Sequence, residues 1–271
     1  MQENNVAQIN EDQGLKGSQR DAPLMVTIPS GEFLMGTSDE QIINLLSEED
    51  WASDWKTEGL FDQEQPQHRV TLPAYEIGQY PIVNRQYHGF VWETGHPTPR
   101  EWAGIVPEEE LLDHPVVGVT LADAVAYCKW LSDKTRKEYR LPTEAEWERA
   151  ARGDDGRLYP WGDVYYPWRS NTKEHRLGAT TKIGTYSPAG DSPWGAIDMA
   201  GNVYEWTSSR FQAYPFTTEN ADAQTGSGEN HIVRGGAWYY SRKLARCAAR
   251  EKVLASFSSP ALGFRIARSL D

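Results

Sequence analysis

Cysteine is scarce in this chain: its 271 residues include only two, Cys128 and Cys247. Two cysteines cannot build the disulfide framework of a small secreted domain, and their separation matches no metal-ligand spacing. They indicate a reducing compartment, so we expect a cytoplasmic protein of bacterial type.

Long apolar runs are also missing. No stretch approaches the roughly 18 consecutive apolar residues that a membrane-spanning helix needs. The mean hydropathy is −0.66, and the first twenty residues hold no apolar block resembling a signal peptide. We therefore expect no membrane partner.

Positive charge is in deficit as well. The chain has 27 Lys and Arg against 39 Asp and Glu, which gives a net charge of −12. A general nucleic-acid binder needs a basic surface that neutralises phosphates and releases counterions. The charge balance disfavours that class of function.

Turn formers and aromatic residues are abundant instead. There are 23 Gly, 16 Pro, 11 Trp and 13 Tyr, and 39% of the residues are hydrophobic. This composition favours a loop-rich fold with a sizeable aromatic core, and the length favours one large domain. We expect that domain to span residues 24–271, after a polar and disordered lead-in at residues 1–23.

Local patterns predict that the helices lie mainly in the first half of the chain. A strand at 24–28 is expected to turn at 29–31 and return at 33–36, and a second strand is expected at 68–72. Residues 41–55 are acidic and partly helical. Helices are predicted at 84–94, 120–134 and 144–152, capped by Asn84, Thr120 and Thr143. After Gly153 only short strands and turns are expected.

Several segments become specific when they are taken together and in order. They are Ile28-Pro-Ser-Gly-Glu-Phe-Leu-Met-Gly36, Glu64-Gln-Pro-Gln-His-Arg-Val70, His114-Pro-Val-Val-Gly-Val-Thr120, Arg140-Leu-Pro-Thr-Glu-Ala-Glu-Trp-Glu148, Tyr159-Pro-Trp-Gly162, Gly201-Asn-Val-Tyr-Glu-Trp-Thr207, Val233-Arg-Gly-Gly-Ala-Trp238 and Leu262-Gly-Phe-Arg265. Over about residues 24–268 the chain closely resembles the formylglycine-generating enzyme, or sulfatase-modifying factor, family.

The resemblance implies an α+β variant of the C-type lectin-like fold, with little regular secondary structure and long loops held by aromatic residues and calcium. Large rigid side chains suit such a fold because they bury much area. We therefore expect Trp147, Trp161, Trp206 and Trp238 to be core supports.

The cysteine pair that the sulfatase-activating members use is missing. Those enzymes carry it, with copper, between the elements that match Gly235-Gly-Ala-Trp238 and Arg246-Cys-Ala-Ala-Arg250, and here that interval has no cysteine. Cys247 belongs to the second element, and Cys128 lies on the apolar face of a predicted helix. Thiol chemistry needs an accessible, activated thiolate. We therefore predict that the chain does not generate formylglycine.

A second catalytic branch, the ergothioneine-type sulfoxide synthases, carries an extra helical domain and a histidine-rich iron motif. The six histidines of this chain (His68, His88, His96, His114, His175 and His231) are scattered without ligand spacing. That branch is a poor match, although an oxidase that uses other residues stays open.

Calcium is the cofactor that the resemblance implies. By motif match the ligands of one family site fall on Asp198, Gly201, Val203 and Glu205. A hard cation prefers six to eight oxygen ligands, which two carboxylates around a glycine turn help to supply. The alternative is a turn whose carboxylates accept hydrogen bonds from backbone N–H groups. A second family site would fall at Asn171 and Thr172, with Glu174 as a weak candidate for its acid.

The segment from Trp238 to Ser259 is the candidate recognition surface. In the variable proteins of diversity-generating retroelements, which look like this family, the same interval displays ligand-contacting residues. Tyr supplies large contact area at low entropic cost, and Ser adapts its hydrogen bonds. The candidate ligand-binding residues are Trp238, Tyr239, Tyr240, Ser241, Lys243, Glu251, Lys252, Phe257 and Ser258. Alternatively, they are ordinary loop residues around the family's cleft.

Three functions follow as hypotheses. The first is a non-catalytic, calcium-stabilised module that binds a protein or a small molecule through this segment. The second is a cysteine-independent oxidase or oxygenase that acts in the same cleft. The third is a regulatory domain of a larger signalling assembly.

Overall fold

The computed structural model describes residues 23–215 and 229–270. Its helices are α2 (Asp39–Glu48), α3 (Ala52–Thr57), α4 (Asn84–Thr94), α5 (Leu121–Thr135) and α6 (Glu144–Arg152), with short 3-10 turns that include η1 (Phe61–Glu64), η4 (Lys173–His175) and η6 (Arg242–Ala245). Its strands are β1 (Met25–Ile28), β2 (Gly31–Met35), β3 (His68–Leu72), β4 (Tyr75–Gly78), β5 (Tyr204–Arg210), β6 (Asn230–Arg234), β7 (Glu251–Leu254), β8 (Leu262–Phe264) and β9 (Ala267–Ser269). The expected lead-in at residues 1–23 lies outside the described residues, apart from Pro23.

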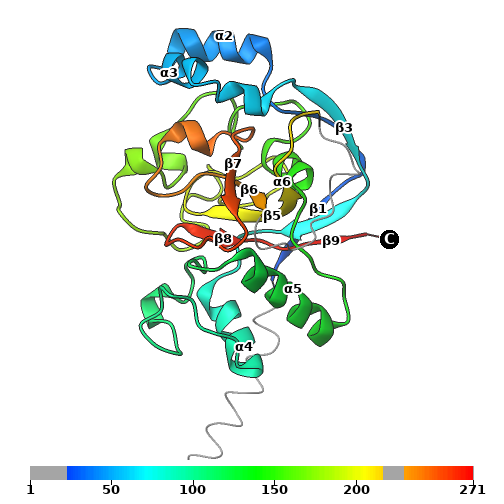
Figure 1. Cartoon of the computed structure of the whole chain (residues 1–271), viewed down its shortest axis with the longest axis vertical. Helices are drawn as coiled ribbons and strands as arrows, with labels where there is room; N and C mark the ends of the chain where they lie inside the picture. Colours follow the sequence, from blue (N-terminus) through cyan, green and yellow to red (C-terminus); the bar gives the residue numbers. More distant parts are fainter. Residues whose placement is uncertain (1–22, 216–228, 271) are drawn as a thin grey trace, which may run out of the picture.

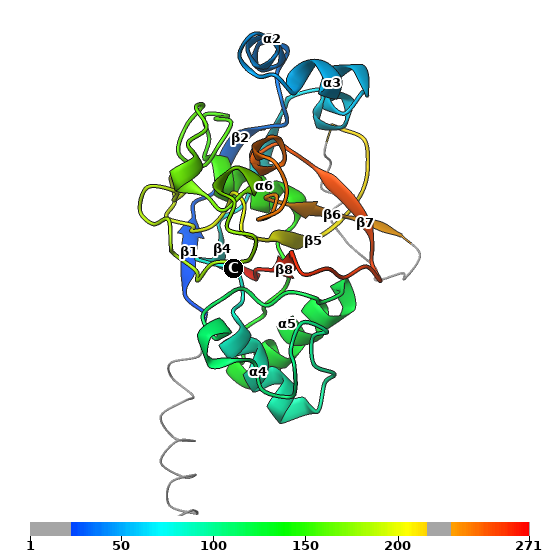
Figure 2. The ribbon, with the colours of Figure 1, turned by 90° about the vertical axis from the view of Figure 1, so that its left-hand side faces the viewer.

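Three small sheets form the middle of the molecule. The largest has the strand order β7-β6-β5-β8, with β5 and β8 parallel and the other pairs antiparallel. The others are β1-β4-β9 and the hairpin β2-β3. Helices α2 and α3 lie at one end of the molecule and α4 and α5 at the other, with the strands between them (Figure 1; Figure 2). The fold is α+β with its α-helices mainly in the first half of the chain, as predicted; α6 lies just beyond the midpoint.

Two helices begin where the sequence predicted. Thr120 and Thr143 each accept a hydrogen bond from the backbone N–H three residues on, and Asp123 and Glu146 close the capping boxes. The third cap was wrong. Val83 is the N-cap of α4 and Asn84 is its first residue.

Asn84 is occupied elsewhere. Its side-chain amide donates to the Leu111 carbonyl at 2.8 Å and accepts from Trp102 Nε1 at 2.8 Å. Asn is a common capping residue, which is why the sequence predicted a cap here, but the Asn84 side chain forms its hydrogen bonds with Leu111 and Trp102 instead of with the helix end.

The expected return strand does not pair with the strand before it. β1 pairs with β4, and β2 pairs with β3, in separate sheets. β4 was not predicted, although Tyr75 and Ile77 on it are both buried. Strand partners depend on which faces can be buried together, so a turn between two strands does not by itself make them a hairpin.

Helix α6 is buried along its whole length, including its charged residues. Glu148 pairs with Arg152 at 2.7 Å and with Arg234 of β6, and Glu144 pairs with Arg250 at 2.6 Å. Burial alone would raise the pKa of Glu148, but the two arginines reverse this and hold it below its ordinary value. The charges of α6 are thus compensated inside the core.

No helix of the described part is both long enough and apolar enough to span a bilayer.

Candidate functional site

The C-terminal segment alternates between buried anchors and half-exposed residues. Arg234, at the end of β6, is fully buried, and so is Arg246, which forms a two-pronged ion pair with Glu64 at 2.7 and 2.8 Å. Residues 244–250 are buried, whereas residues 238–243 are half-buried and most of β7 is exposed. The segment is therefore fixed at both ends of its exposed part.

Four aromatic side chains meet on this segment and on β5, and we call them the aromatic platform: Trp238, Tyr239, Tyr240 and Tyr204. The ring centroids of Trp238 and Tyr239 are 4.8 Å apart, those of Tyr239 and Tyr240 4.3 Å, and those of Tyr240 and Tyr204 5.2 Å. The Tyr239 hydroxyl donates to the Tyr240 hydroxyl at 3.3 Å. Tyr204 was not among the sequence candidates, because it lies in the Gly-Asn-Val-Tyr-Glu-Trp motif, outside the segment from Trp238 to Ser259.

The charge beside the platform is negative. Burial raises the pKa of Tyr204 well above its ordinary value, and the next contribution comes from Glu251. Burial also raises the pKa of Tyr240, followed by Tyr239 and then Glu251. The Tyr204 hydroxyl is buried and has no hydrogen-bond partner among the residues that the structure describes. The platform thus combines neutral rings, an unsatisfied hydroxyl and a nearby carboxylate.

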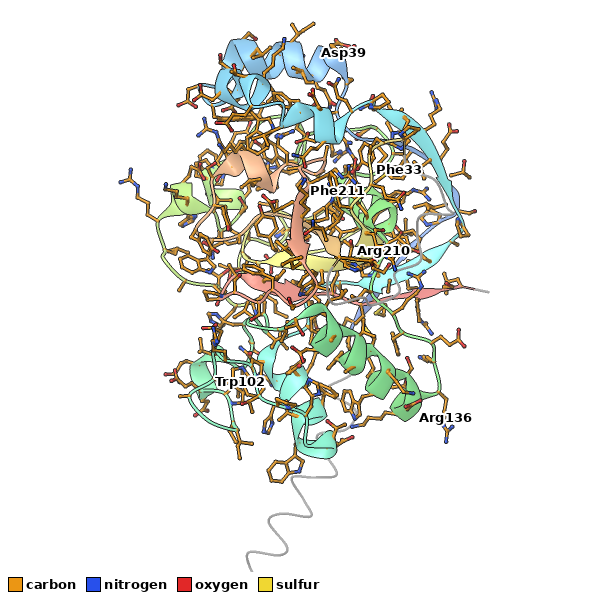
Figure 3. All side chains as sticks on the ribbon, viewed as in Figure 1. Phe33, Asp39, Trp102, Arg136, Arg210 and Phe211 are labelled. Carbon is orange, nitrogen blue, oxygen red and sulfur yellow. The ribbon has the colours of Figure 1, made fainter. Side chains whose placement is uncertain are left out.

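The other sequence candidates lie elsewhere. Lys243 Nζ is 4.7 Å from the centroid of the Trp55 ring, and Lys252 Nζ is 4.4 Å from that of Phe211. Phe211 is labelled in Figure 3, beside β7. Ser241 precedes η6 as its N-cap. Phe257 and Ser258 follow β7 in a turn, where Phe257 is 46% exposed. The structure therefore brings together part of the predicted surface.

The predicted core tryptophans also divide in two. Trp147 and Trp206 are fully buried, as expected. Trp161 and Trp238 are only partly buried at the edge of the core, so that prediction was wrong for them. Trp161 stacks on Tyr159 at 5.5 Å and borders an open cavity of about 590 Å³ beside α2.

The candidate calcium ligand Glu205 is already engaged. Arg265 donates to both of its oxygens, at 2.6 and 2.7 Å, and Trp147 Nε1 donates to Oε2 at 2.7 Å. An ionised carboxylate offers about four lone pairs, so these three bonds leave roughly one, on Oε1. Glu205 can give a cation at most a single contact in this arrangement.

Asp198 is better suited to a cation. It is 8% exposed and accepts one hydrogen bond, from the Gly184 N–H at 3.0 Å. Burial raises its pKa to about 6 although the Gly184 bond and Arg265 oppose this. A desolvated carboxylate without a direct cation partner, followed by the turn that carries Gly201 and Val203, fits a hard cation.

The second candidate site has one oxygen without a partner. Asn171 Oδ1 is buried and accepts no hydrogen bond from any described residue, whereas Thr172 Oγ1 is 2.5 Å from the Tyr165 hydroxyl. The carboxylate of Glu174 accepts from the backbone N–H of Arg242 at 3.0 and 3.1 Å. Glu174 is thus engaged by η6. The described residues contain no group of three or more His, Cys, Asp or Glu side chains arranged to hold a metal ion.

Both cysteines are free and buried. They belong to different hydrophobic clusters: Cys128 lies on α5 in one, and Cys247 shares the other with residues of α6. Burial raises the pKa of each thiol to about 12. Neither carries the thiolate that nucleophilic or redox chemistry requires at neutral pH.

Comparison with known proteins gives a consistent family. The profile described as "Sulfatase-modifying factor enzyme 1-like domain" matches residues 12–270. The formylglycine-generating enzyme of Streptomyces coelicolor is 30% identical, over 91% of this chain and 89% of that protein. The hercynine oxygenase of Mycolicibacterium smegmatis is also 30% identical, over 83% of this chain and 56% of that protein. A mouse relative, 29% identical over 91% of this chain and 86% of that protein, is named inactive C-alpha-formylglycine-generating enzyme 2.

Two solved structures share the fold. PvdO from Pseudomonas aeruginosa is 28% identical, with a TM-score of 0.73 over 93% of this chain and 96% of that one. Treponema denticola variable protein 1 has a TM-score of 0.71 at 20% identity, over 90% of this chain and 94% of that one. The second likeness concerns the fold alone.

Proposed function

The chain belongs to the sulfatase-modifying factor family, and we propose that it is a non-catalytic binding module whose aromatic platform contacts the ligand. The observation that carries the proposal is the contrast within residues 234–250. Buried arginines hold the segment at both ends, and the half-exposed Trp238, Tyr239 and Tyr240 lie between them. Rigid aromatic side chains on a fixed backbone bind at low entropic cost.

The state of the thiols supports a role without cysteine chemistry. Cys128 and Cys247 are buried in separate clusters, and the pKa of each is raised to about 12. The name of the mouse relative shows that inactive members occur in this family. We propose on these grounds that the chain does not generate formylglycine. Two free thiols also support the proposed cytoplasmic location.

Calcium is proposed as a stabiliser of the platform's base. Asp198 would hold the ion together with the carbonyls of Gly201 and Val203, while Glu205 would add one oxygen. Bound there, calcium would balance the buried charge of Asp198 and fix the turn that leads into β5, the strand that carries Tyr204 of the platform. Asn171, with its unpartnered Oδ1, is the starting point of the second proposed site.

An oxidase is the second candidate, favoured by one observation: a hercynine oxygenase is 30% identical over 83% of this chain. Metal analysis of the purified protein separates the two candidates, since stoichiometric copper or iron with oxygen consumption would favour the oxidase. Calcium, with no oxygen consumption, would favour the binding module.

The binding proposal is tested by a fragment screen with ligand-detected NMR on the wild-type protein and on Tyr239→Leu. The matched control is Trp92→Leu, because Trp92 is exposed on α4, at one end of the molecule, and is not part of the platform. We expect hits that are lost in Tyr239→Leu and retained in Trp92→Leu. Hits that all survive in Tyr239→Leu would contradict the location of the proposed site.

A further inference from the structure

The aromatic faces of the molecule differ in whether they already carry a cation. Arg246 lies 5.3 Å from the centroid of the Trp51 ring, Lys243 4.7 Å from that of Trp55, and Arg234 5.4 Å from that of Trp147. Among the described residues, no Lys or Arg lies over a ring of the platform. The platform therefore has rings of the kind on which this protein elsewhere places its own cations, and the described residues place none on them.

The carboxylate beside the platform is also free. Glu251 is exposed at the start of β7, where Oε1 accepts only a local bond from the Lys252 N–H at 3.0 Å. Within residues 23–215 and 229–270 it forms no ion pair. In the largest sheet Glu251 lies opposite Val233, and Val233 lies opposite Trp206, two residues along β5 from Tyr204. Alternate residues of a strand face the same side of the sheet, so Glu251 and Tyr204 lie on one side of it. A negative charge thus lies on the same side of the sheet as the platform's Tyr204.

Hydrogen-bond acceptors are present as well. Tyr204 is only 6% exposed, and within residues 23–215 and 229–270 its hydroxyl has no hydrogen-bond partner. A buried hydroxyl without a partner costs free energy, which a ligand would recover by bonding to it. The Tyr240 hydroxyl already accepts from Tyr239, and it retains a lone pair and its own proton.

We propose that the aromatic platform binds an organic cation with N–H donors, an ammonium or guanidinium group, between its tyrosine rings and the carboxylate of Glu251. The rings supply cation–π attraction, and Glu251 and the tyrosine hydroxyls accept the N–H hydrogen bonds. The net charge of −12 adds a general attraction for cations. This inference rests on the proposed function and specifies its ligand class.

The test compares four probes of similar size. N-acetyl-lysine methylamide and N-acetyl-arginine methylamide carry the cation, N-acetyl-norleucine methylamide is the neutral counterpart, and N-acetyl-glutamate methylamide is the anion. Titration by saturation-transfer NMR is expected to give dissociation constants for a cationic probe about tenfold lower than for norleucine. Equal or tighter binding of the neutral or anionic probe would overturn the proposal.

Variants then locate the interaction. Glu251→Gln is expected to weaken the affinity for a cationic probe about fivefold. Glu110→Gln is the control and should leave that affinity unchanged, because Glu110 is also exposed and is distant from Glu251 in the sequence. Tyr239→Phe should retain the affinity for the cationic probe within about twofold, and Tyr239→Leu should weaken it about fivefold, because only the second variant removes the ring. Since Glu251 is exposed, its variant is expected to fold normally. An unchanged affinity in Glu251→Gln would contradict the proposal.

Three further outcomes show whether this inference, the proposed function or both are wrong. If tetramethylammonium binds as tightly as the lysine probe, the N–H donors take no part, and that element of the proposal is wrong. If only neutral or anionic probes bind and Tyr239→Leu abolishes their binding, the platform is a binding surface but its ligand is not a cation. If no probe responds to Tyr239→Leu, both proposals fail at this location.

Discussion

Helix α6 and the aromatic platform belong to one structural unit but differ in how their polar and charged groups are paired. Around α6, every charge on Glu144, Glu148 and Arg234 finds a buried partner. On the platform, Trp238, Tyr239 and Tyr240 are half-exposed, and the hydroxyl of the buried Tyr204 has no partner in the described part of the chain. The comparison teaches that this fold pairs the charges that it buries around α6, and that on the platform it leaves aromatic rings half-exposed, where a ligand can reach them.

The largest expected effect is on the satisfied region. Arg234→Met leaves Glu148 buried with one cation fewer, which is expected to cost about 3–5 kcal/mol of unfolding free energy. Urea denaturation measures it. Lys129→Ala is the control, because it breaks an exposed i,i+4 pair with Asp133 at 3.2 Å worth about 0.3–0.5 kcal/mol. Similar costs for the two variants would contradict the role given to the buried network.

Asp198 sharpens the comparison, because it is buried without a direct cation partner. Its folded pKa of about 6 lies above its unfolded value of 3.8. The folded state therefore binds the proton more tightly, and metal-free protein loses stability as pH rises from about 4 through 6. The loss is expected to approach about 2–3 kcal/mol at neutral pH.

The measurement is the unfolding free energy of the wild-type protein and of Asp198→Asn at pH 5 and pH 7.5, after chelation. The variant should be more stable than the wild type at pH 7.5, by more than at pH 5. Added calcium is expected to remove or invert the difference at pH 7.5. A pH response identical in the two proteins would exclude Asp198 as its source, and an absence of any calcium effect would contradict the proposed ion.

Tyr204→Phe probes the unsatisfied hydroxyl itself. Removing a buried hydroxyl that has no partner is expected to raise the unfolding free energy by about 0.5–1 kcal/mol. Thermal unfolding measures this, with Tyr75→Phe as the control, because the Tyr75 hydroxyl donates to the Glu146 carbonyl at 2.6 Å. A loss of stability in Tyr204→Phe as large as in Tyr75→Phe would mean that the hydroxyl is satisfied.

The smallest expected effect is on the reactivity of the two cysteine thiols. We expect both cysteines to resist a thiol reagent in the native protein and to react on unfolding, since both are buried with their pKa raised to about 12. With a reagent that releases a coloured product when it reacts with a thiol, the absorbance of that product measures the extent of labelling. Fast labelling of either cysteine at neutral pH would reopen thiol chemistry.

Local features of the structure could be predicted from the sequence, and features that depend on distant partners could not. Each capping box, at Thr120 and at Thr143, spans only four residues, so it can be recognised in the sequence alone. The pairing of β1 with β4 depends on shared burial, and the cap at Asn84 was lost to Trp102 and Leu111. Family motifs gave the fold, but they could not show which aromatic residues are buried.

The candidate site shows the same division. Trp238, Tyr239 and Tyr240 are adjacent in sequence and were predicted together, whereas Tyr204 joins them only through the packing of β5. Lys243 and Lys252 were predicted beside them, but each extends over a different aromatic ring. A long side chain on a surface segment can point to either side, and neighbours distant in sequence decide which.

The most direct test of the central claim measures binding and stability on one variant, Tyr239→Leu. If the platform is displayed on a scaffold that does not depend on it, the variant should lose its ligand while its unfolding free energy stays within about 1 kcal/mol of the wild type. A loss of more than about 3 kcal/mol would place Tyr239 in the core. Retention of ligand binding with unchanged stability would contradict the claim that the platform is the binding surface.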